Sequence, residues 1–115
     1  MRRGEIYVVN LKPVKSGEAN KRRPAVIVSN DGANVAAERT GQGVITVVPV
    51  TSNISRVYPF QVLLPANVTG LGHDSKAQAE QVRSISVERL GYTIGEVPQE
   101  LMSELDEALR LHLAL

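Results

Sequence analysis

The apolar residues of this chain fall in many short runs, which predicts a fold rich in β-strands. The runs consist of Val, Ile, Leu and Ala and are bounded by Gly, Pro, Asn or Asp, which is typical of strands that end in turns. The longest run contains Pro49, which favours a bulge or an edge position, and we expect a kink near Glu80 and Gln81. The predicted strands are residues 6–9, 24–28, 44–51, 60–64, 75–79, 82–85 and 92–97.

Helical spacing is clearest from Pro98 to the end of the chain. Pro98 suits the first turn of a helix, and Glu100 favours its N-terminal dipole. We expect the apolar face to be packed, and the apolar end at 111–115 to be buried or to lie at a dimer interface. That face consists of Leu101, Leu105, Ala108, Leu109, His112 and Leu113.

A shorter helix is expected from Ala33 to Arg39, with Asn30 or Asp31 as its cap. Between the first two strands lies a polar, charged loop from Lys12 to Arg22, longer than the usual ~4–6 residues and hence a candidate functional segment. Together these elements predict a single domain over residues 1–115. We expect a mostly β (α+β) fold in which a small barrel or strongly bent sheet carries the terminal helix.

The amino-acid composition excludes several kinds of site. The 115 residues include no cysteine, which excludes disulfides, thiolate metal sites and cysteine nucleophiles. The net charge is only +1, with nine arginines against four lysines, so a nucleic-acid site would need local clustering of basic residues. No apolar run approaches the ~20 residues of a membrane span, and the N-terminal run is too short for a signal peptide. We therefore expect a cytoplasmic protein with no membrane partner.

Common catalytic motifs are absent from the sequence. There is no nucleophile elbow, phosphate-binding glycine loop or dinucleotide fingerprint. Only two histidines are present: His112 on the apolar helix face, where we expect it to be packed, and His73 in a glycine-containing segment beside Asp74. With no carboxylate cluster near either histidine, the sequence does not favour a metal site.

Polar residues instead follow or precede predicted strands. Arg23 comes directly before an apolar strand that begins at Pro24, so its backbone should be anchored. Lys21, Arg22 and Arg23 form a short basic cluster, and the common interpretation of such a cluster is a turn exposed to solvent. A flexible surface arginine, however, rarely has its backbone held by an ordered strand. Thr51 and Ser52 close the third strand. A cation and a hydroxyl group are therefore the candidate chemistry.

Several segments, taken in order over nearly the whole chain, resemble the MazF/PemK toxins of bacterial toxin–antitoxin pairs. Each segment is weak evidence alone, and the ordered set is specific. The segments are Gly4-Glu5-Ile6-Tyr7, Glu18 ahead of Arg23-Pro24-Ala25-Val26-Ile27-Val28-Ser29-Asn30-Asp31, Val48-Pro49-Val50-Thr51-Ser52, Tyr58-Pro59-Phe60, Ala79-Glu80-Gln81-Val82-Arg83-Ser84-Ile85 and the closing helix.

The resemblance implies a small SH3-like barrel, a homodimer and a sequence-specific endoribonuclease that cleaves single-stranded RNA. It implies no metal and no cofactor, and products with 2′,3′-cyclic phosphate and 5′-hydroxyl ends. A cognate antitoxin would restrain the enzyme by laying an acidic, extended segment along the toxin, and operator DNA would be bound only through that antitoxin. Whether mRNA, rRNA or tRNA is the target does not follow from the residue types.

By the same resemblance, Arg23 is the catalytic arginine and Thr51 the catalytic threonine. An arginine can brace two phosphoryl oxygens without losing its charge, and a threonine hydroxyl can donate to phosphate. Glu18 is a candidate general base, although a carboxylate of ordinary pKa is weak in that role, and the identity of the base stays open. The implied RNA contacts are Arg22, Asn30, Ser52, Gln81 and Arg83.

Two rival interpretations remain at this point. The same barrel occurs in toxins that bind DNA gyrase through the C-terminal helix, and such a toxin would not need Arg23 together with Thr51. A second rival is an inert member that binds antitoxin and RNA without cleavage. For Tyr58 and Phe60, packing in the core is favoured over stacking on bases.

Overall fold

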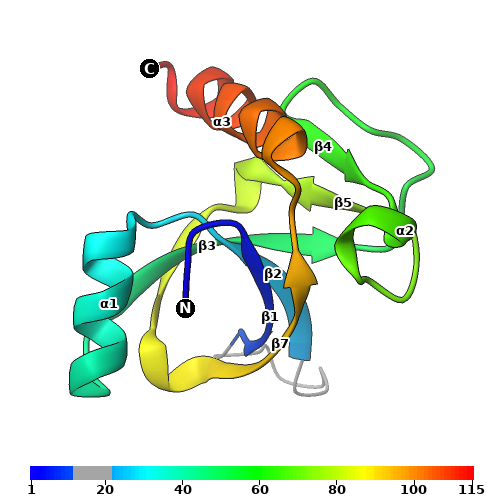
Figure 1. Cartoon of the computed structure of the whole chain (residues 1–115). Helices are drawn as coiled ribbons and strands as arrows, with labels where there is room; N and C mark the ends of the chain where they lie inside the picture. Colours follow the sequence, from blue (N-terminus) through cyan, green and yellow to red (C-terminus); the bar gives the residue numbers. More distant parts are fainter. Residues whose placement is uncertain (12–21) are drawn as a thin grey trace, which may run out of the picture.

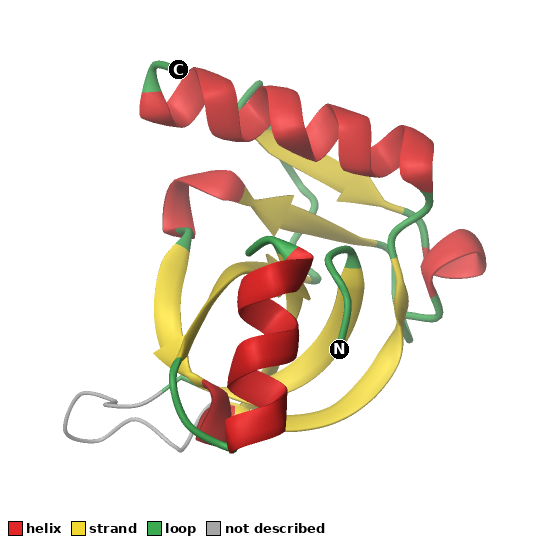
Figure 2. Ribbon diagram, turned by 60° about the vertical axis from the view of Figure 1, so that its left-hand side comes forward, coloured by secondary structure: helices red, strands yellow, loops and turns green. Residues whose placement is uncertain are grey.

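In the computed structural model, residues 1–11 and 22–115 are described, and they form one strongly bent antiparallel sheet with helices packed on it (Figures 1 and 2). This confirms the expected mostly β (α+β) fold. The strands are β1 (Glu5–Asn10), β2 (Arg22–Ile27), β3 (Val44–Thr51), β4 (Gln61–Leu64), β5 (Ser75–Gln78), β6 (Arg83–Ser86) and β7 (Leu90–Glu96). The helices are α1 (Asp31–Thr40), α2 (Ala66–Thr69) and α3 (Gln99–Leu113), with 3₁₀ turns η1 (Ala79–Gln81) and η2 (Val87–Arg89).

Strand β3 lies at the centre of the sheet, whose order is β4-β5-β3-β2-β1-β7, and β6 also pairs with β3. One edge of β3 pairs with β2, while the other pairs first with β6, as far as Val47, and then with β5 from Val50 onward. Pro49 lies at this change of partner, where its missing N–H is tolerated. The strand is therefore not an edge, and the irregularity predicted from Pro49 is the switch from β6 to β5.

The kink predicted near Glu80 and Gln81 is the η1 turn, which joins β5 to β6. It allows the two strands to follow one another along the same side of β3. The η1 turn connects the two strands that pair with β3 on this side, so it accounts for the switch of partner from β6 to β5. The segment from 66 to 73, expected only as a connection, contains the single-turn helix α2.

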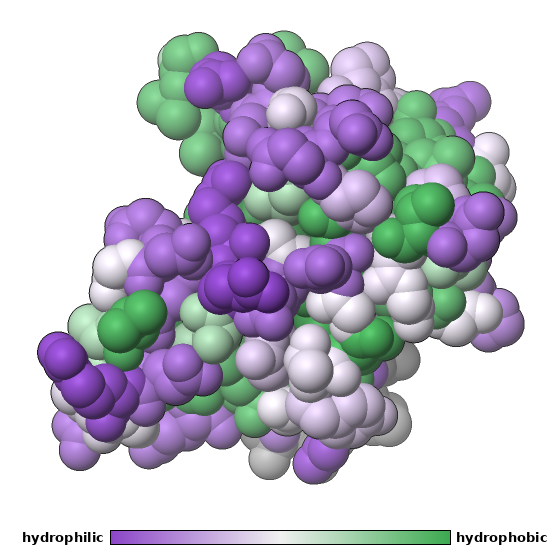
Figure 3. Space-filling model, in the orientation of Figure 1, coloured by the Kyte–Doolittle hydropathy of each residue, from purple (hydrophilic) through white to green (hydrophobic). Residues whose placement is uncertain are grey.

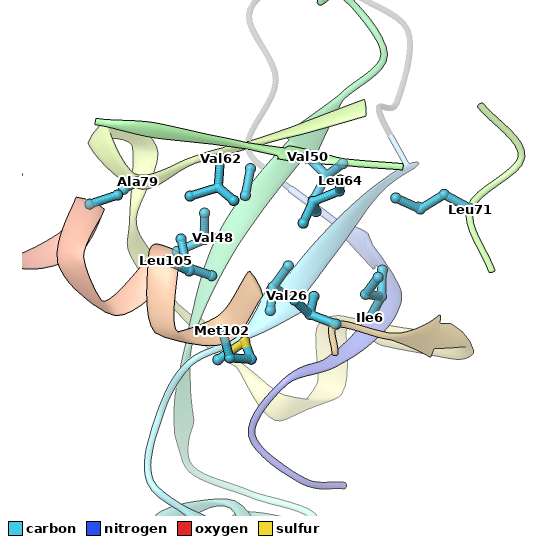
Figure 4. Close-up of a cluster of buried hydrophobic side chains, with 13 residues drawn as sticks. Ile6, Val26, Val48, Val50, Val62, Leu64, Leu71, Ala79, Met102 and Leu105 are labelled. Atoms are coloured by element: carbon cyan, nitrogen blue, oxygen red, sulfur yellow. The ribbon is translucent and has the colours of Figure 1, made fainter. Parts of the chain in front are cut away.

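Two clusters of buried apolar side chains form the core. The larger cluster lies beneath α3 and joins β-strand residues such as Val26, Val48 and Leu64 to Met102 and Leu105 of the helix (Figure 4). The second cluster includes Ile27, Ile45 and Val47 and is covered by α1 through Ala37. Consecutive residues of β2 and β3 are fully buried and alternate between the two clusters, as Val26 and Ile27 do, which explains why continuous apolar runs of the sequence become strands.

The C-terminal helix packs over a shorter length than its sequence pattern predicts. Met102, Leu105 and Ala108 are its buried residues, and Met102 is not on the predicted face. His112 and Leu113 are exposed, so the expectation that they pack within the chain is wrong, whereas a dimer interface at 111–115 stays a prediction. Burial ends after Ala108 because the helix continues beyond the part of the sheet that it covers.

A close contact fixes helix α2 against β7. A Cβ atom at Gly95 would lie 1.9 Å from the carbonyl oxygen of Thr69, so only glycine permits this approach. Gly70 follows with φ +87°, and Leu71 then enters the core. This contact places the segment after α2 beside the start of β5. In the part of the chain that the structure describes, no helix has the length and apolar character to cross a membrane.

Candidate functional site

Arg23 and Thr51 lie on neighbouring strands at the same end of the β2–β3 pair. Ala25 faces Pro49 in this antiparallel ladder, and the same register continued by two residues places Arg23 opposite Thr51. Residues opposite one another in such a pair have Cβ atoms ~4.5–5.5 Å apart. On the other edge of β2, Arg23 pairs with Val9 of β1. The predicted anchoring of Arg23 by an ordered strand is therefore confirmed.

These two residues line a pocket of about 310 Å³. Its walls come from β2, from the end of β3, from the segment after α2 and from the start of β5. The floor is largely apolar, and the polar groups lie around it. The lining residues are Arg23, Pro24, Val50, Thr51, Ser52, Leu71, Gly72, His73 and Ser75.

The guanidinium of Arg23 is available to an anion in this pocket. The side chain is half-buried, and none of the carboxylates in the described residues forms an ion pair with it. A partly buried arginine without a carboxylate partner retains its charge and its fork of N–H donors. It can therefore hold two oxygens of one phosphate at once.

The hydroxyl of Thr51 is oriented by its own backbone neighbourhood. The backbone N–H of Asn53 donates to Thr51 Oγ1 at 3.3 Å. That contact uses a lone pair of the oxygen and leaves the hydroxyl proton for donation into the pocket. Ser52 adds a second hydroxyl at the rim. A phosphate braced by Arg23 would thus find a hydroxyl donor on the adjacent strand.

A second pocket of about 190 Å³ lies on the other side of Arg23, which lines both pockets. Its polar lining includes Gln78, Gln81 and Arg83 beside Pro49. The structure thus brings two predicted RNA contacts, Gln81 and Arg83, next to Arg23. Gln78 was not predicted from the sequence, although its place one residue before the η1 turn could have marked it. Side-chain amides of this kind can hydrogen-bond to the edges of unpaired bases.

Three other predicted residues lie elsewhere. Arg22 points to the opposite side of β2 from Arg23 because strand side chains alternate, and it lines a different pocket with Asn10. Asn30 caps α1, where its side chain accepts the Ala33 N–H at 2.8 Å, which confirms one of the two predicted caps. Glu18 and the loop from Lys12 to Lys21 fall outside the described residues.

His73 is a pocket residue that the sequence analysis set aside. It lines the same pocket as Arg23 and Thr51, although it lies 22 residues beyond Thr51 in the chain. Its position depends on the contact between Gly95 and Thr69 and on the pairing of β5 with β3. No local motif around His73 carries that information. Within the described residues, no three His, Asp or Glu side chains form a group that could hold a metal ion.

The loop between β3 and β4 is organised by a buried lysine. Lys76 is only 8% exposed, and its Nζ donates to the carbonyl oxygen of Arg56 at 2.6 Å. The rings of Tyr58 and Phe60 stack with centroids 5.3 Å apart, and the Arg56 guanidinium lies over Tyr58. Tyr58 is 41% exposed, so the expectation that it packs in the core is wrong. This loop begins at Ser52 and thus borders the pocket.

Comparisons with known proteins show what the whole chain is similar to. Residues 2–113 match the family described as PemK-like, MazF-like toxins of type II toxin–antitoxin systems. The chain is 64% identical over 115 residues to endoribonuclease MazF9 of Mycobacterium tuberculosis, covering 100% of this chain and 98% of the relative.

Two solved structures show the same fold. The Mycobacterium tuberculosis toxin MazF-mt6 has a TM-score of 0.77 at 25% identity, with 96% of this chain and 97% of that chain covered. A mycobacterial endoribonuclease in complex with its cognate antitoxin has a TM-score of 0.76 at 24% identity. The second comparison covers 100% of this chain and 96% of the other.

Proposed function

The chain belongs to the family of PemK-like, MazF-like toxins of type II toxin–antitoxin systems, and from that premise we propose that it cleaves single-stranded RNA in the pocket of Arg23 and Thr51. The family predicted from the sequence is thereby confirmed. The predicted enzyme class agrees with the 64% identical relative, which is named an endoribonuclease. We propose that cleavage is sequence-specific, needs no metal or cofactor, and inhibits translation and growth.

The observation that carries this proposal is the presence in one pocket of an oriented hydroxyl and of an arginine that forms no ion pair with any carboxylate of residues 1–11 and 22–115. In the proposed reaction, the 2′-oxygen of a ribose attacks the adjacent phosphorus while the bond from phosphorus to the 5′-oxygen breaks. Arg23 neutralises charge that builds on the phosphoryl oxygens, and Thr51 donates to one of them. Holding the attacking and leaving oxygens in line supplies the remaining acceleration.

The neighbouring pocket supports recognition of particular bases. Gln78 and Gln81 place amide donors and acceptors directly beside the Arg23 side chain, and Arg83 adds a basic group. Unpaired bases on either side of a cleaved phosphate would reach such groups, since single-stranded RNA exposes its base edges. Ser52 on the opposite side would contact the phosphate or sugar.

A toxin that binds gyrase through its last helix is the less favoured alternative. Such a protein has no use for Arg23 beside Thr51, whereas the structure brings these residues together. A 64% identical relative that matches over the whole chain is named an endoribonuclease. An inert member is disfavoured by the same pocket, and the cleavage experiment below tests it.

We propose that the partners are a cognate antitoxin and a second copy of this chain. Hydrophobic surface gathers at the C-terminal end of α3 (Figure 3), where Leu111, Leu113 and Leu115 are 58%, 49% and 85% exposed. An exposed group of leucines on a small protein supports a protein–protein contact there. An acidic, extended antitoxin segment would find a positive charge at Arg23, which would block RNA. Operator DNA binding would come only through the antitoxin.

The predicted cytoplasmic location follows from the proposed substrate, because RNA is made and used there. It remains a proposal. Localisation by fractionation of cells that express the tagged chain, beside a cytoplasmic and a membrane marker, would test it. Recovery with the membrane marker would contradict the proposal.

The test of function is cleavage of a long single-stranded transcript by the purified protein in the presence of EDTA. We expect discrete fragments with 2′,3′-cyclic phosphate and 5′-hydroxyl ends, cut at one short sequence. Mapping the ends also identifies that sequence. An uncut transcript would contradict the proposal, and cleavage that disappears with EDTA would show a metal requirement. A gyrase supercoiling assay with the same protein tests the alternative.

A further inference from the structure

The reaction proposed above requires a proton donor that Arg23 and Thr51 do not supply. When the bond from phosphorus to the 5′-oxygen breaks, that oxygen leaves as an alkoxide unless a proton reaches it. Arginine keeps its proton at any physiological pH, and a threonine hydroxyl does not ionise in this range. A carboxylate can remove a proton at neutral pH but holds none to give. A donor for the leaving oxygen therefore has to be a different kind of group.

His73 is the residue of the pocket that fits this requirement. Among the described residues that line the pocket, it alone has a side chain whose charge ordinarily changes between pH 5 and 8. The side chain lines the pocket and is exposed, so it is accessible to an RNA bound there. Its imidazolium form can donate a proton, which is the usual function of histidine in acid–base catalysis.

The backbone around His73 is held on both sides. Leu71 is buried in the core, and the Ser75 hydroxyl donates to the His73 carbonyl oxygen at 2.8 Å. The carboxylate of Asp74 accepts the backbone N–H of Ala66 at 2.8 Å. These contacts fix where the side chain starts, as a catalytic group requires.

We propose that His73 is the general acid that protonates the 5′-oxygen as it leaves. This inference rests on the proposed RNA cleavage and extends it by one step. The 2′-oxygen forms its bond to phosphorus and loses its proton to a base; the bond to the 5′-oxygen breaks, and the proton of His73 passes to that oxygen. The products are a 2′,3′-cyclic phosphate, a 5′-hydroxyl and neutral His73, which water recharges with a proton.

The charged groups near His73 set the expected pH dependence. Arg23 faces the pocket from β2 as a cation, Thr51 and Ser52 line it with neutral hydroxyls, and the Asp74 carboxylate accepts the Ala66 N–H. Activity that depends on a protonated imidazole falls as the pH rises through the ionisation range of histidine. The activity of a variant without His73 should not decrease in this way as the pH rises.

The test uses His73→Gln on two RNA substrates that carry the mapped cleavage sequence. One has the normal 5′-oxygen at the cleaved phosphate, and the other has sulfur in its place, because a thiolate leaves without a proton. We expect the variant to cleave the normal substrate ~10²-fold more slowly or worse. It should cleave the sulfur substrate at nearly the wild-type rate, and its rate on the normal substrate should not fall at high pH.

Controls separate the role of His73 from folding and from the proposed function. His112→Gln removes the other histidine, exposed on α3, and should leave both rates and the pH profile unchanged. Imidazole added to His73→Gly should restore part of the rate on the normal substrate, which a folding defect would not allow. Equal rates of His73→Gln and wild type on the normal substrate, or an equal loss on both substrates, would overturn the proposal. If wild-type protein cuts neither substrate, the proposed function fails and this inference with it.

Discussion

The two ends of the β2–β3 pair carry similar polar residues and use them differently. At the end covered by α1, the Ser29 hydroxyl donates to Asn34 Oδ1 at 2.5 Å and accepts the Thr46 N–H at 3.1 Å. The Asn34 side chain also donates to the Ser29 carbonyl oxygen at 2.9 Å. At the other end, Arg23 has no ion pair within the described residues, and the Thr51 hydroxyl proton is free for a ligand.

This difference separates residues that serve the fold from residues that serve a substrate. Buried polar groups are normally satisfied by the protein itself, and the closed end with Asn34 obeys that rule. An arginine and a hydroxyl that the described part of the chain leaves available in a pocket are instead suited to an external anion. By the same reasoning we assign Asn30 to the residues that serve the fold, because its side chain caps α1.

Apart from the effect of Arg23 itself, the largest effect that sharpens the comparison is expected at Thr51. Thr51→Val removes the hydroxyl and keeps the shape, and we expect the specificity constant for RNA cleavage to fall ~10²-fold. Thr46→Val makes the same change near the closed end of the same strand. It should leave cleavage unchanged, because the hydrogen bonds that join Thr46 to Val28 and Ser29 come from its backbone. Similar cleavage rates for the two variants would contradict the assignment of Thr51.

A smaller effect is expected at Asn34, where a substitution should lower stability and leave cleavage unchanged. Asn34 is fully buried, and Asn34→Ala leaves Ser29 without its side-chain partner. We expect the free energy of unfolding in urea to fall by about 2 kcal/mol. The cleavage rate of the folded protein should stay at the wild-type value. A lower cleavage rate with an unchanged free energy of unfolding would contradict the distinction between the two ends of the β2–β3 pair.

The smallest effect concerns Asp31 at the start of α1. The backbone N–H of Arg3 donates to its carboxylate at 2.7 Å and lowers its pKa below the ordinary value. A lowered pKa in the folded state adds stability that is present above the unfolded pKa and is lost as the pH falls through the folded pKa.

The matching experiment compares Asp31→Asn with wild type at neutral pH and near pH 3. The wild type should have the higher melting temperature at neutral pH, and the difference should shrink as the carboxyl becomes protonated in acid. Cleavage at neutral pH should be the same for both proteins. A difference in melting temperature that is as large near pH 3 as at pH 7 would show that the carboxylate charge is not its cause.

The sequence predicted the strands well because their apolar runs are local and are bounded by turn residues. It also placed Arg23 correctly at the entrance of a buried strand. The end of α3 was mispredicted because apolar periodicity gives the direction of a helix face and not the length of sheet beneath it. Leu113 and His112 continue the pattern after the packing partner has ended.

The candidate site was only partly predictable for a similar reason. Arg23 and Thr51 could be named by resemblance to a family, while their shared pocket depends on strand register. His73 comes to line the same pocket as Arg23 through contacts between distant segments, notably Gly95 against Thr69 and β5 against β3. Such contacts leave no local pattern in the sequence.

The central claim is that Arg23 serves the substrate and not the fold, and Arg23→Gln tests it most directly. Its cleavage rate on a single-stranded transcript should be measured with its free energy of unfolding, beside wild type. We predict a rate about 10³-fold lower, with an unfolding free energy within about 0.5 kcal/mol of wild type. Cleavage at the wild-type rate by a folded Arg23→Gln protein would contradict the account.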